Sequence, residues 1–210
     1  SQSGNEGLGW EKSWLTDVGI NVGFWNRLNL ELTFYNKATS DMLMLVPQSY
    51  SITGEGSYWK NMGSLVNRGV EIGLDAAILR VKSFVLNFNA NVTYNKNRIT
   101  ALYNGVTEFV NSTTGFKYMV GHPVSEYYYN RYAGVNPANG TQLWYDKNGN
   151  LTDEMLESDK VMTGKSHDPA WWGGFGLDFG WKGLQLSAQF SWMAERWIVN
   201  NDRYFDENSA

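Results

Sequence analysis

The oxygen-bearing side chains between Asp146 and Glu157 have the spacing of a calcium-binding loop. Counting from Asp146, they occupy positions 1, 3, 5, 7, 9 and 12, which supply the ligands in loops of that type. Such a loop needs a glycine at position 6 for its sharp turn. Here Leu151 stands at position 6 and Gly149 at position 4. A polar turn is therefore the favoured interpretation, with calcium binding as the alternative, and we predict no metal site.

A second group of candidates is aromatic. Tyr127, Tyr128 and Tyr129 are consecutive, and Trp144 follows in the same long segment between predicted strands. Flat rings can stack on the faces of sugars, and loops held by a rigid scaffold often carry binding residues. Packing of these rings against the rest of the protein is the favoured alternative. We retain the four residues as candidates for ligand contact.

No arrangement of residues indicates catalysis. The two histidines, His122 and His167, are far apart and lack the His-x-x-x-His spacing of a zinc site. The acidic run at 153–159 is typical of a solvated face rather than of a paired-carboxylate site. The chain has no cysteine, and its net charge of −4 comes without a basic stripe that could bind nucleic acid. We predict neither an enzyme nor a cofactor.

The elements that must position these residues are strands with period-two alternation of apolar and polar side chains. The clearest case is 84–95, where phenylalanine, leucine, alanine, valine and tyrosine alternate with asparagine and threonine. The same pattern predicts strands in six ranges: 18–24, 28–34, 70–78, 84–95, 175–181 and 184–192. A half-buried sheet in a soluble sandwich would also alternate.

Three features favour a membrane-spanning barrel over a soluble sandwich. Several runs reach about ten residues, the length that a tilted strand needs to cross a bilayer. The polar face consists mainly of asparagine, serine, glutamine, threonine and glycine, as in a barrel lumen. Aromatic residues such as Phe24, Tyr94, Trp181 and Trp192 stand near strand ends, where an interfacial girdle would place them.

The connections between the predicted strands alternate in length. Short turns at 25–27, 79–83 and 182–183 alternate with long links at 36–68 and 97–172. We therefore predict an all-β, antiparallel, up-and-down transmembrane β-barrel with short periplasmic turns and long extracellular loops. Six strands would leave unpaired edges in lipid, so the chain is expected to be part of a larger barrel.

Several stretches resemble the SusC/RagA family of TonB-dependent outer-membrane transporters. In order, they are NEGLGWEKSWLTDVGINVGFWNRLNLELTFYNKATSDMLMLVP (5–47), NMGSLVNRGVEIGL (61–74), FNANVTYNKNRI (88–99), VGHPVSEYYYNRYAGVNPANGTQLWYDKNGN (120–150) and PAWWGGFGLDFGWKGLQLSAQFSW (169–192). Within the second stretch, Asn67, Arg68, Gly69 and Glu71 belong to the family motif and are expected to be structural. Arg68 and Glu71 are expected to point to one side of a strand entry, where Gly69 is expected to mark a bulge, although a regular strand would place them on opposite faces because they are three positions apart.

The resemblance implies a function for the whole protein. Residues 1–210 would be a partial barrel domain, with the plug, the early strands and the final strands outside this chain. The expected function is import of nutrients, oligosaccharides or peptides, across the cell outer membrane. The implied partners are outer-membrane lipid, a SusD-like surface lipoprotein and, through the missing N-terminal part, TonB. The alternatives are a siderophore or vitamin receptor of the same class and, in a different class, a soluble β-rich adhesin or structural protein.

Overall fold

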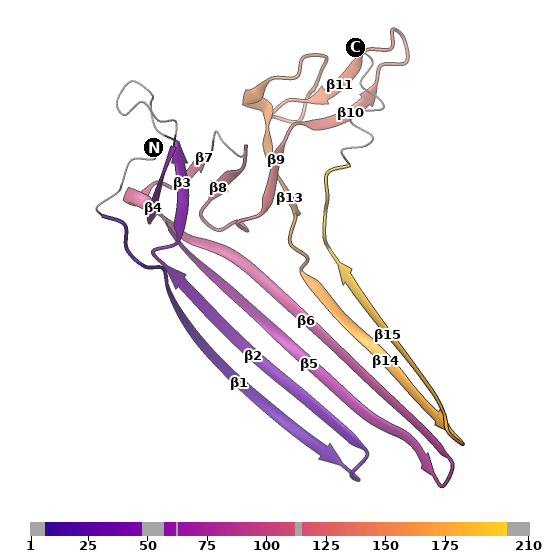
Figure 1. Ribbon diagram of the computed structural model, residues 1–210. Coiled ribbons are helices and arrows are strands. Elements are labelled where there is room, and N and C mark those ends of the chain that lie inside the picture. Colours follow the sequence, from indigo (N-terminus) through magenta and orange to yellow (C-terminus); the bar gives the residue numbers. More distant parts are fainter. Residues whose placement is uncertain (1–6, 48–56, 62, 112–114, 201–210) are drawn as a thin grey trace.

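Six long antiparallel strands form one open sheet in the computed structural model, which describes residues 7–47, 57–61, 63–111 and 115–200 (Figure 1). The strand order is β1-β2-β5-β6-β14-β15, so each long strand lies beside its nearest long neighbour in the sequence. Their bounds are β1 (Lys12–Phe24), β2 (Leu28–Ser40), β5 (Gly63–Val81), β6 (Phe84–Leu102), β14 (Trp171–Trp181) and β15 (Leu184–Ala194). All six predicted strands and the antiparallel all-β fold are thus confirmed.

Shorter elements lie beyond one end of this sheet (Figure 1). Four small sheets form there: β3 (Leu43–Pro47) with β4 (Ser57–Asn61); β7 (Glu108–Val110) with β8 (Lys117–Met119); β9 (Glu126–Tyr129) with β13 (Val161–Ser166); and β10 (Arg131–Val135), β11 (Gln142–Tyr145) and β12 (Leu151–Thr152). Two single-turn 3-10 helices, η1 (Tyr103–Gly105) and η2 (Glu157–Asp159), complete the elements of the described residues. We call this region the loop region.

The connections confirm the predicted alternation of short and long links. The hairpins β1–β2, β5–β6 and β14–β15 turn together at the end of the sheet opposite the loop region, which we call the turn end (Figure 1). The β14–β15 turn has positive φ angles at Lys182 (45°) and Gly183 (89°), as a two-residue turn compatible with strand twist requires. No helix among the described residues is long and apolar enough to span a membrane.

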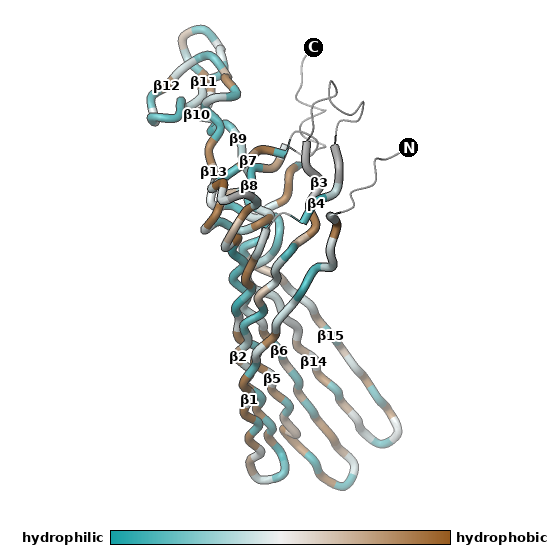
Figure 2. The backbone as a smooth tube through the Cα atoms, turned by 90° about the vertical axis from the view of Figure 1, so that its left-hand side faces the viewer, coloured by the Kyte–Doolittle hydropathy of each residue, from teal (hydrophilic) through white to brown (hydrophobic). Residues whose placement is uncertain are grey.

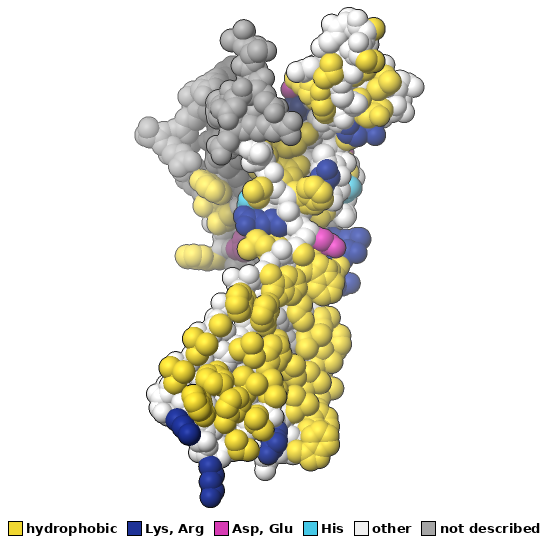
Figure 3. Space-filling view, turned by 90° about the vertical axis from the view of Figure 1, so that its right-hand side faces the viewer, with side chains coloured by type: hydrophobic (Ala, Val, Ile, Leu, Met, Phe, Trp, Pro, Cys, Tyr) yellow, Lys and Arg dark blue, Asp and Glu magenta, His cyan; other side chains and the backbone are white. Residues whose placement is uncertain are grey.

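The register places every second side chain of neighbouring strands on one common face. We call the face that carries Leu30, with its partners Val22 and Leu74, the apolar face. On the other strands this face carries Ala90, Phe175 and Phe190 at the same level. The alternation is visible along each strand in Figure 2, and hydrophobic side chains cover the lower sheet in Figure 3.

The opposite, polar face is formed mainly by polar side chains and glycine. Asn91 lies between Gly73 and Gly174 at one level of the sheet. Hydrogen bonds link neighbouring strands on this face, for example from Asn21 Nδ2 to Glu31 Oε1 at 2.9 Å. Such a lining is typical of a barrel lumen.

Little of the sheet is buried. Ile99 and Leu102 are the buried hydrophobic residues of the described chain, at 1% and 6% exposure, and both lie where β6 enters the loop region. By contrast, Val18 and Ile20 on the apolar face are 65% and 59% exposed. Among the described residues no second layer covers this face, so its apolar rows need a non-aqueous surrounding, as lipid provides.

The strands are longer than the alternation predicted, and they are extended mainly at the loop end. β1 begins at Lys12 rather than at residue 18, and β5 and β6 each have 19 residues. Near the loop end both faces of the strands carry polar side chains, so the hydrophobic period disappears while backbone pairing continues. Hydrophobic periodicity therefore predicted the part of each strand that has one apolar face, and it missed the rest of the strand.

The expected bulge at Gly69 is wrong. Pairing is regular through Gly69, and the register shifts lie between Ser64 and Leu65 and between Ala77 and Leu79. Gly69 is instead required by a close approach, because a Cβ there would overlap the Tyr35 ring and the backbone oxygen of Tyr94. The Tyr35 ring crosses over Gly69 on the polar face, and its hydroxyl donates to Asn95 Oδ1 at 2.9 Å.

Candidate functional site

Asn67 and Arg68 of the family motif at residues 67–71 link neighbouring strands near the loop end of the sheet. Asn67 Oδ1 accepts hydrogen bonds from Asn95 Nδ2 (3.2 Å) and Asn97 Nδ2 (2.9 Å) on the polar face. Arg68 lies on the apolar face, where its Nε donates to Asn36 Oδ1 at 2.7 Å. Glu71 lies on the polar face, paired with Thr33 and therefore opposite in direction to Arg68. The expectation that the two side chains point to one side is wrong, because the strand is regular at this point. The Asn67 and Arg68 side chains thus make strand-to-strand contacts.

The loop region is attached to the upper end of β6. The backbone N–H of Ile99 donates to His122 O (2.9 Å), and the N–H of Gly121 donates back to Ile99 O (2.8 Å). Asn97 Oδ1 also accepts the N–H of Val124 at 2.9 Å. The segment before β9 thus continues the pairing of β6 and fixes where β9 starts.

A buried carboxylate joins β9 to β13. Glu126 is 3% exposed, and its Oε2 lies 2.9 Å from His122 Nδ1. Its Oε1 accepts the N–H of Gly164 at 2.7 Å, where the register of β13 and β9 shifts. A buried charge needs such partners. Glu126 therefore determines how the two strands rise from the sheet.

Alternation along β9 splits the three consecutive tyrosines between two faces. Tyr127 and Tyr129 stack with ring centroids 5.6 Å apart, and Phe116 stacks on Tyr127 at 6.2 Å. We call these three rings the aromatic ladder. Tyr129 is 48% exposed, so about half of the residue is accessible to solvent. Tyr128 lies on the other face, under the Lys117 ammonium at 5.1 Å from the ring centroid.

Tyr127 is held by polar contacts at its hydroxyl. The hydroxyl donates to the backbone oxygen of Trp197 at 3.0 Å and lies 3.2 Å from His167 Nδ1. Burial raises the pKa of Tyr127, and Tyr129 adds to this while Arg196 opposes it. The residue therefore stays a neutral phenol at neutral pH and connects the ladder to the segment that follows β15.

Trp144 does not belong to the aromatic ladder. It lies in the β10-β11-β12 sheet, where its ring meets Tyr132 edge-on at 5.3 Å and 66°. The structure thus brings together two of the four aromatic candidates, and it adds Phe116, which the sequence reading missed. Phe116 directly precedes the short strand β8, and no hydrophobic periodicity in this segment predicts a role for it.

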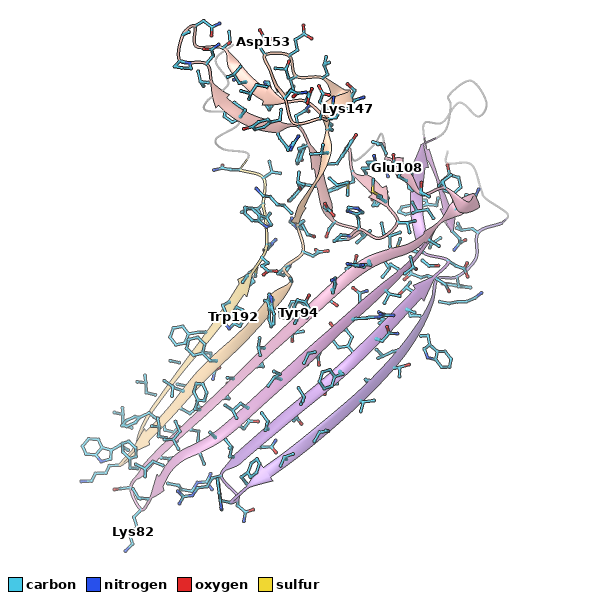
Figure 4. All side chains as sticks on the ribbon, turned by 180° about the vertical axis from the view of Figure 1, so that it is seen from behind. Lys82, Tyr94, Glu108, Lys147, Asp153 and Trp192 are labelled. Atoms are coloured by element: carbon cyan, nitrogen blue, oxygen red, sulfur yellow. The ribbon has the colours of Figure 1, made fainter. Side chains whose placement is uncertain are left out.

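The Asp146 segment forms a closed turn. Asp146 Oδ1 accepts the N–H groups of Asn148 and Asn150, each at 2.8 Å, and Oδ2 accepts Asn150 Nδ2 at 3.1 Å. These hydrogen bonds, those from Asn150 first, lower the pKa of Asp146. Within the described ranges, no group of three or more histidine, aspartate or glutamate side chains could hold a metal ion. Figure 4 shows the neighbouring Lys147 and Asp153 at the far end of the loop region.

Known proteins match the chain along its whole length. The family model described as TonB dependent receptor-like, beta-barrel matches residues 1–209. The TonB-dependent receptor SusC of Bacteroides thetaiotaomicron is 30% identical over 163 residues, which cover 70% of this chain and 16% of that protein. The TonB-dependent receptor P3 of Formosa agariphila is 28% identical over 210 residues, covering 89% of this chain and 20% of that protein.

Solved structures agree. The RagAB peptide transporter superposes with a TM-score of 0.90 at 38% identity, covering 99% of this chain and 24% of that chain. The RagAB peptide importer in its open-open state gives 0.89 at 37%, covering 100% of this chain and 23% of that chain. This chain thus spans no more than about a quarter of the length of these relatives. The chain belongs to the TonB-dependent receptor family, in its SusC/RagA group, and its six long strands are part of that family's β-barrel.

Proposed function

We propose that this chain forms part of the wall and outer loops of an outer-membrane importer of nutrients. The observation that carries the proposal is the register of the six-stranded sheet, which aligns apolar side chains on one face and small polar ones on the other. β14 and β15, at 11 residues each, have the length of a membrane-crossing strand. Family membership supports transport as the activity, and the proposal assigns no catalysis and no cofactor to the chain.

The proposed complete protein contains more than these strands. Within the described residues β1 and β15 pair on one side only, and an unpaired edge in lipid is costly because its backbone groups find no partners. A larger barrel would close around residues 1–210, with a plug and with TonB as the energy-coupling partner. A SusD-like surface lipoprotein would cover the loop region, as the similarity to the SusC/RagA group supports.

Peptides are the proposed cargo, with oligosaccharides as the second candidate. Similarity to a peptide transporter over 99% of the chain favours peptides. The aromatic ladder can serve either cargo, because flat rings stack on aromatic and proline side chains and on sugar faces. Tyr129 is the candidate for direct contact, since it is the half-exposed tyrosine of the ladder.

Uptake by cells with and without the gene tests the function. We expect the intact protein in the outer-membrane fraction, with heat-modifiable migration, and we expect deletion of its gene to reduce uptake of a labelled peptide mixture. Release as a soluble monomer without detergent would contradict the barrel. Loss of iron–siderophore or vitamin uptake, with peptide and oligosaccharide uptake unchanged, would establish the siderophore or vitamin receptor instead.

Alanine substitution tests the cargo contact. Tyr129→Ala should weaken binding of transported peptides about 3- to 10-fold, the range of one ring interaction. Tyr128→Ala is the matched control, because Tyr128 lies on the opposite face of β9 under Lys117. Equal affinities of Tyr129→Ala and the unmodified protein would remove the ladder from the cargo site.

A further inference from the structure

On the apolar face, a row of apolar side chains meets a row of polar ones at the same level on four strands, and we call this level the boundary. The apolar row consists of Val18, Phe34, Val70, Tyr94 and Trp171. The next row toward the loop region consists of Thr16, Asn36, Arg68 and Lys96, and the row beyond it carries Trp14, Ala38, Val66 and Arg98. The Tyr94 and Trp171 rings lie 4.6 Å apart at the boundary, as aromatic residues do at a membrane interface. Figure 4 shows Tyr94 close to Trp192 at this end of the strands and Lys82 at the turn end.

Two cations face each other directly above this boundary. Arg68 of β5 and Lys96 of β6 are register partners on the same face, and both are exposed. Arg98 is exposed two positions further along β6. Like charges directly opposite each other on neighbouring strands are destabilising. This pair therefore gains from an anion placed between the two side chains.

Two of the nearby carboxylates have other partners. Among the described residues, the ion pairs involve none of these three cations. Glu126 contacts His122 Nδ1 and accepts a hydrogen bond from the Gly164 N–H. Asp168 accepts a hydrogen bond from the Ser125 hydroxyl at 2.7 Å. Glu195 is the exception: it lines a separate cavity together with Lys96 and Arg98, and it forms no ion pair within the described chain.

A shallow hollow lies below the cations. It measures about 350 Å³ and is lined by Phe34, Tyr35, Asn36, Arg68, Gly69, Val70, Tyr94 and Lys96. It lies where the smaller Val70 side chain stands between the larger Phe34 and Tyr94 in the apolar row. Its floor is apolar, and its upper rim carries Arg68 and Lys96.

We propose that this hollow binds an anionic, phosphate-bearing lipid of the outer leaflet. Arg68 and Lys96 contact the phosphate, with Arg98 close behind, and an acyl chain lies against Phe34 and Val70. Guanidinium and ammonium groups are suited to phosphate, and each basic side chain at a membrane surface strengthens the attraction to anionic lipid. The inference rests on the proposed placement of this chain in the outer membrane.

The combination of features selects a lipid over a free ion. Inorganic phosphate would use the cations but not the apolar floor. An acidic segment of a neighbouring protein would use the cations without depending on lipid phosphate. A phosphorylated lipid uses both parts of the hollow.

The test measures lipid binding to the intact protein that carries this chain, purified in a neutral detergent. The probes are lipid A with two phosphates and the same lipid after phosphatase treatment, each followed by native mass spectrometry. We expect the phosphorylated lipid to bind at least fivefold more tightly, and we expect 10 mM inorganic phosphate not to displace it. Lys96→Gln should weaken binding about fivefold and Arg68→Gln/Lys96→Gln about 20-fold, the effect of one and two charges.

Lys37→Gln is the matched control. Lys37 lies one position beyond Asn36 on β2, so it stands at the same height but on the polar face. Equal losses for Lys37→Gln and Lys96→Gln, equal binding of both lipids, or displacement by inorganic phosphate would each overturn the proposal. The comparison of the two lipids needs no variant and so remains decisive if a variant fails to fold. Heat-modifiable migration of the unmodified protein tests separately whether the intact protein forms a β-barrel, as the proposed function requires.

Discussion

The sheet and the loop region are stabilised in different ways. In the sheet, long strands pair continuously while large apolar side chains such as Val18 and Ile20 remain exposed. In the loop region the strands are short, and buried polar groups such as Glu126 and Asp159 are held by specific hydrogen bonds. The sheet thus depends on its surrounding and on register, whereas the loop region depends on individual side-chain contacts.

This difference indicates where each kind of substitution acts. A change on the apolar face acts through the solvent that the face meets, and so through the membrane. A change in the loop region is expected to act through local hydrogen bonds and to leave the sheet intact. The two buried hydrophobic residues of the described chain, Ile99 and Leu102, lie at the junction and belong to both regions.

The largest expected effect comes from a charge in the middle of the apolar face. Ala90→Arg places a cation between Leu74 and Phe175 and should lower the free energy of unfolding by about 3 kcal/mol, as for a cation near the bilayer midplane. The measurement is urea unfolding of the intact protein in phospholipid vesicles. Asn91→Arg is the control, since Asn91 points to the polar face between Gly73 and Gly174. Equal losses for both variants would show that the apolar face does not meet lipid.

A smaller loss is expected at Gly69. Gly69→Ala forces a Cβ into the Tyr35 ring and the Tyr94 backbone oxygen, and overpacking of this kind costs about 2 kcal/mol. The control is Gly73→Ala, where the added Cβ meets the Glu31 side chain at an ordinary 3.5 Å. Unfolding in vesicles again provides the measurement. A loss at Gly73 as large as that at Gly69 would mean that the Tyr35 crossing is not what requires glycine.

Gly69 also illustrates which features could be predicted from the sequence and which could not. Alternation predicted all six long strands and their two faces, because a period of two is a direct consequence of strand geometry. The role of Gly69 was missed, since it depends on Tyr35, a residue 34 positions earlier in the chain that register brings alongside. In the loop region, alternation separates Tyr128 from Tyr127 and Tyr129, but only the fold brings Phe116 to them and keeps Trp144 away.

In the loop region, Glu126 is expected to have the largest effect. Glu126→Gln removes the charge that faces His122 and leaves weaker hydrogen bonds, so local opening of β9 and β13 should become easier by about 1.5 kcal/mol. Amide hydrogen exchange measures it: residues 120–129 and 161–166 should exchange faster while β14 and β15 stay unchanged. Glu157→Gln is the control, because the Glu157 side chain is 84% exposed in its pair with Lys160 and such pairs contribute little. Faster exchange throughout the sheet would show that the two regions are not independent.

The smallest effect concerns the Asp146 turn and its dependence on pH. Hydrogen bonds from the backbone and side chain of Asn150 hold the pKa of Asp146 below its usual value of 3.8. Since the folded pKa is lowered, the stabilisation of the turn is complete above the unfolded pKa and is lost as pH falls through the folded one. Exchange at 146–152, corrected for intrinsic rates, should therefore be constant from pH 7 to pH 5 and should rise only below the usual carboxyl range. Asp159 Oδ1 also accepts the Lys147 N–H at 3.2 Å, so pH alone does not identify the group. Asp146→Asn should remove most of the acid-induced rise, whereas Asp153→Asn should retain it, and an unchanged rise in Asp146→Asn would assign the effect to another carboxylate.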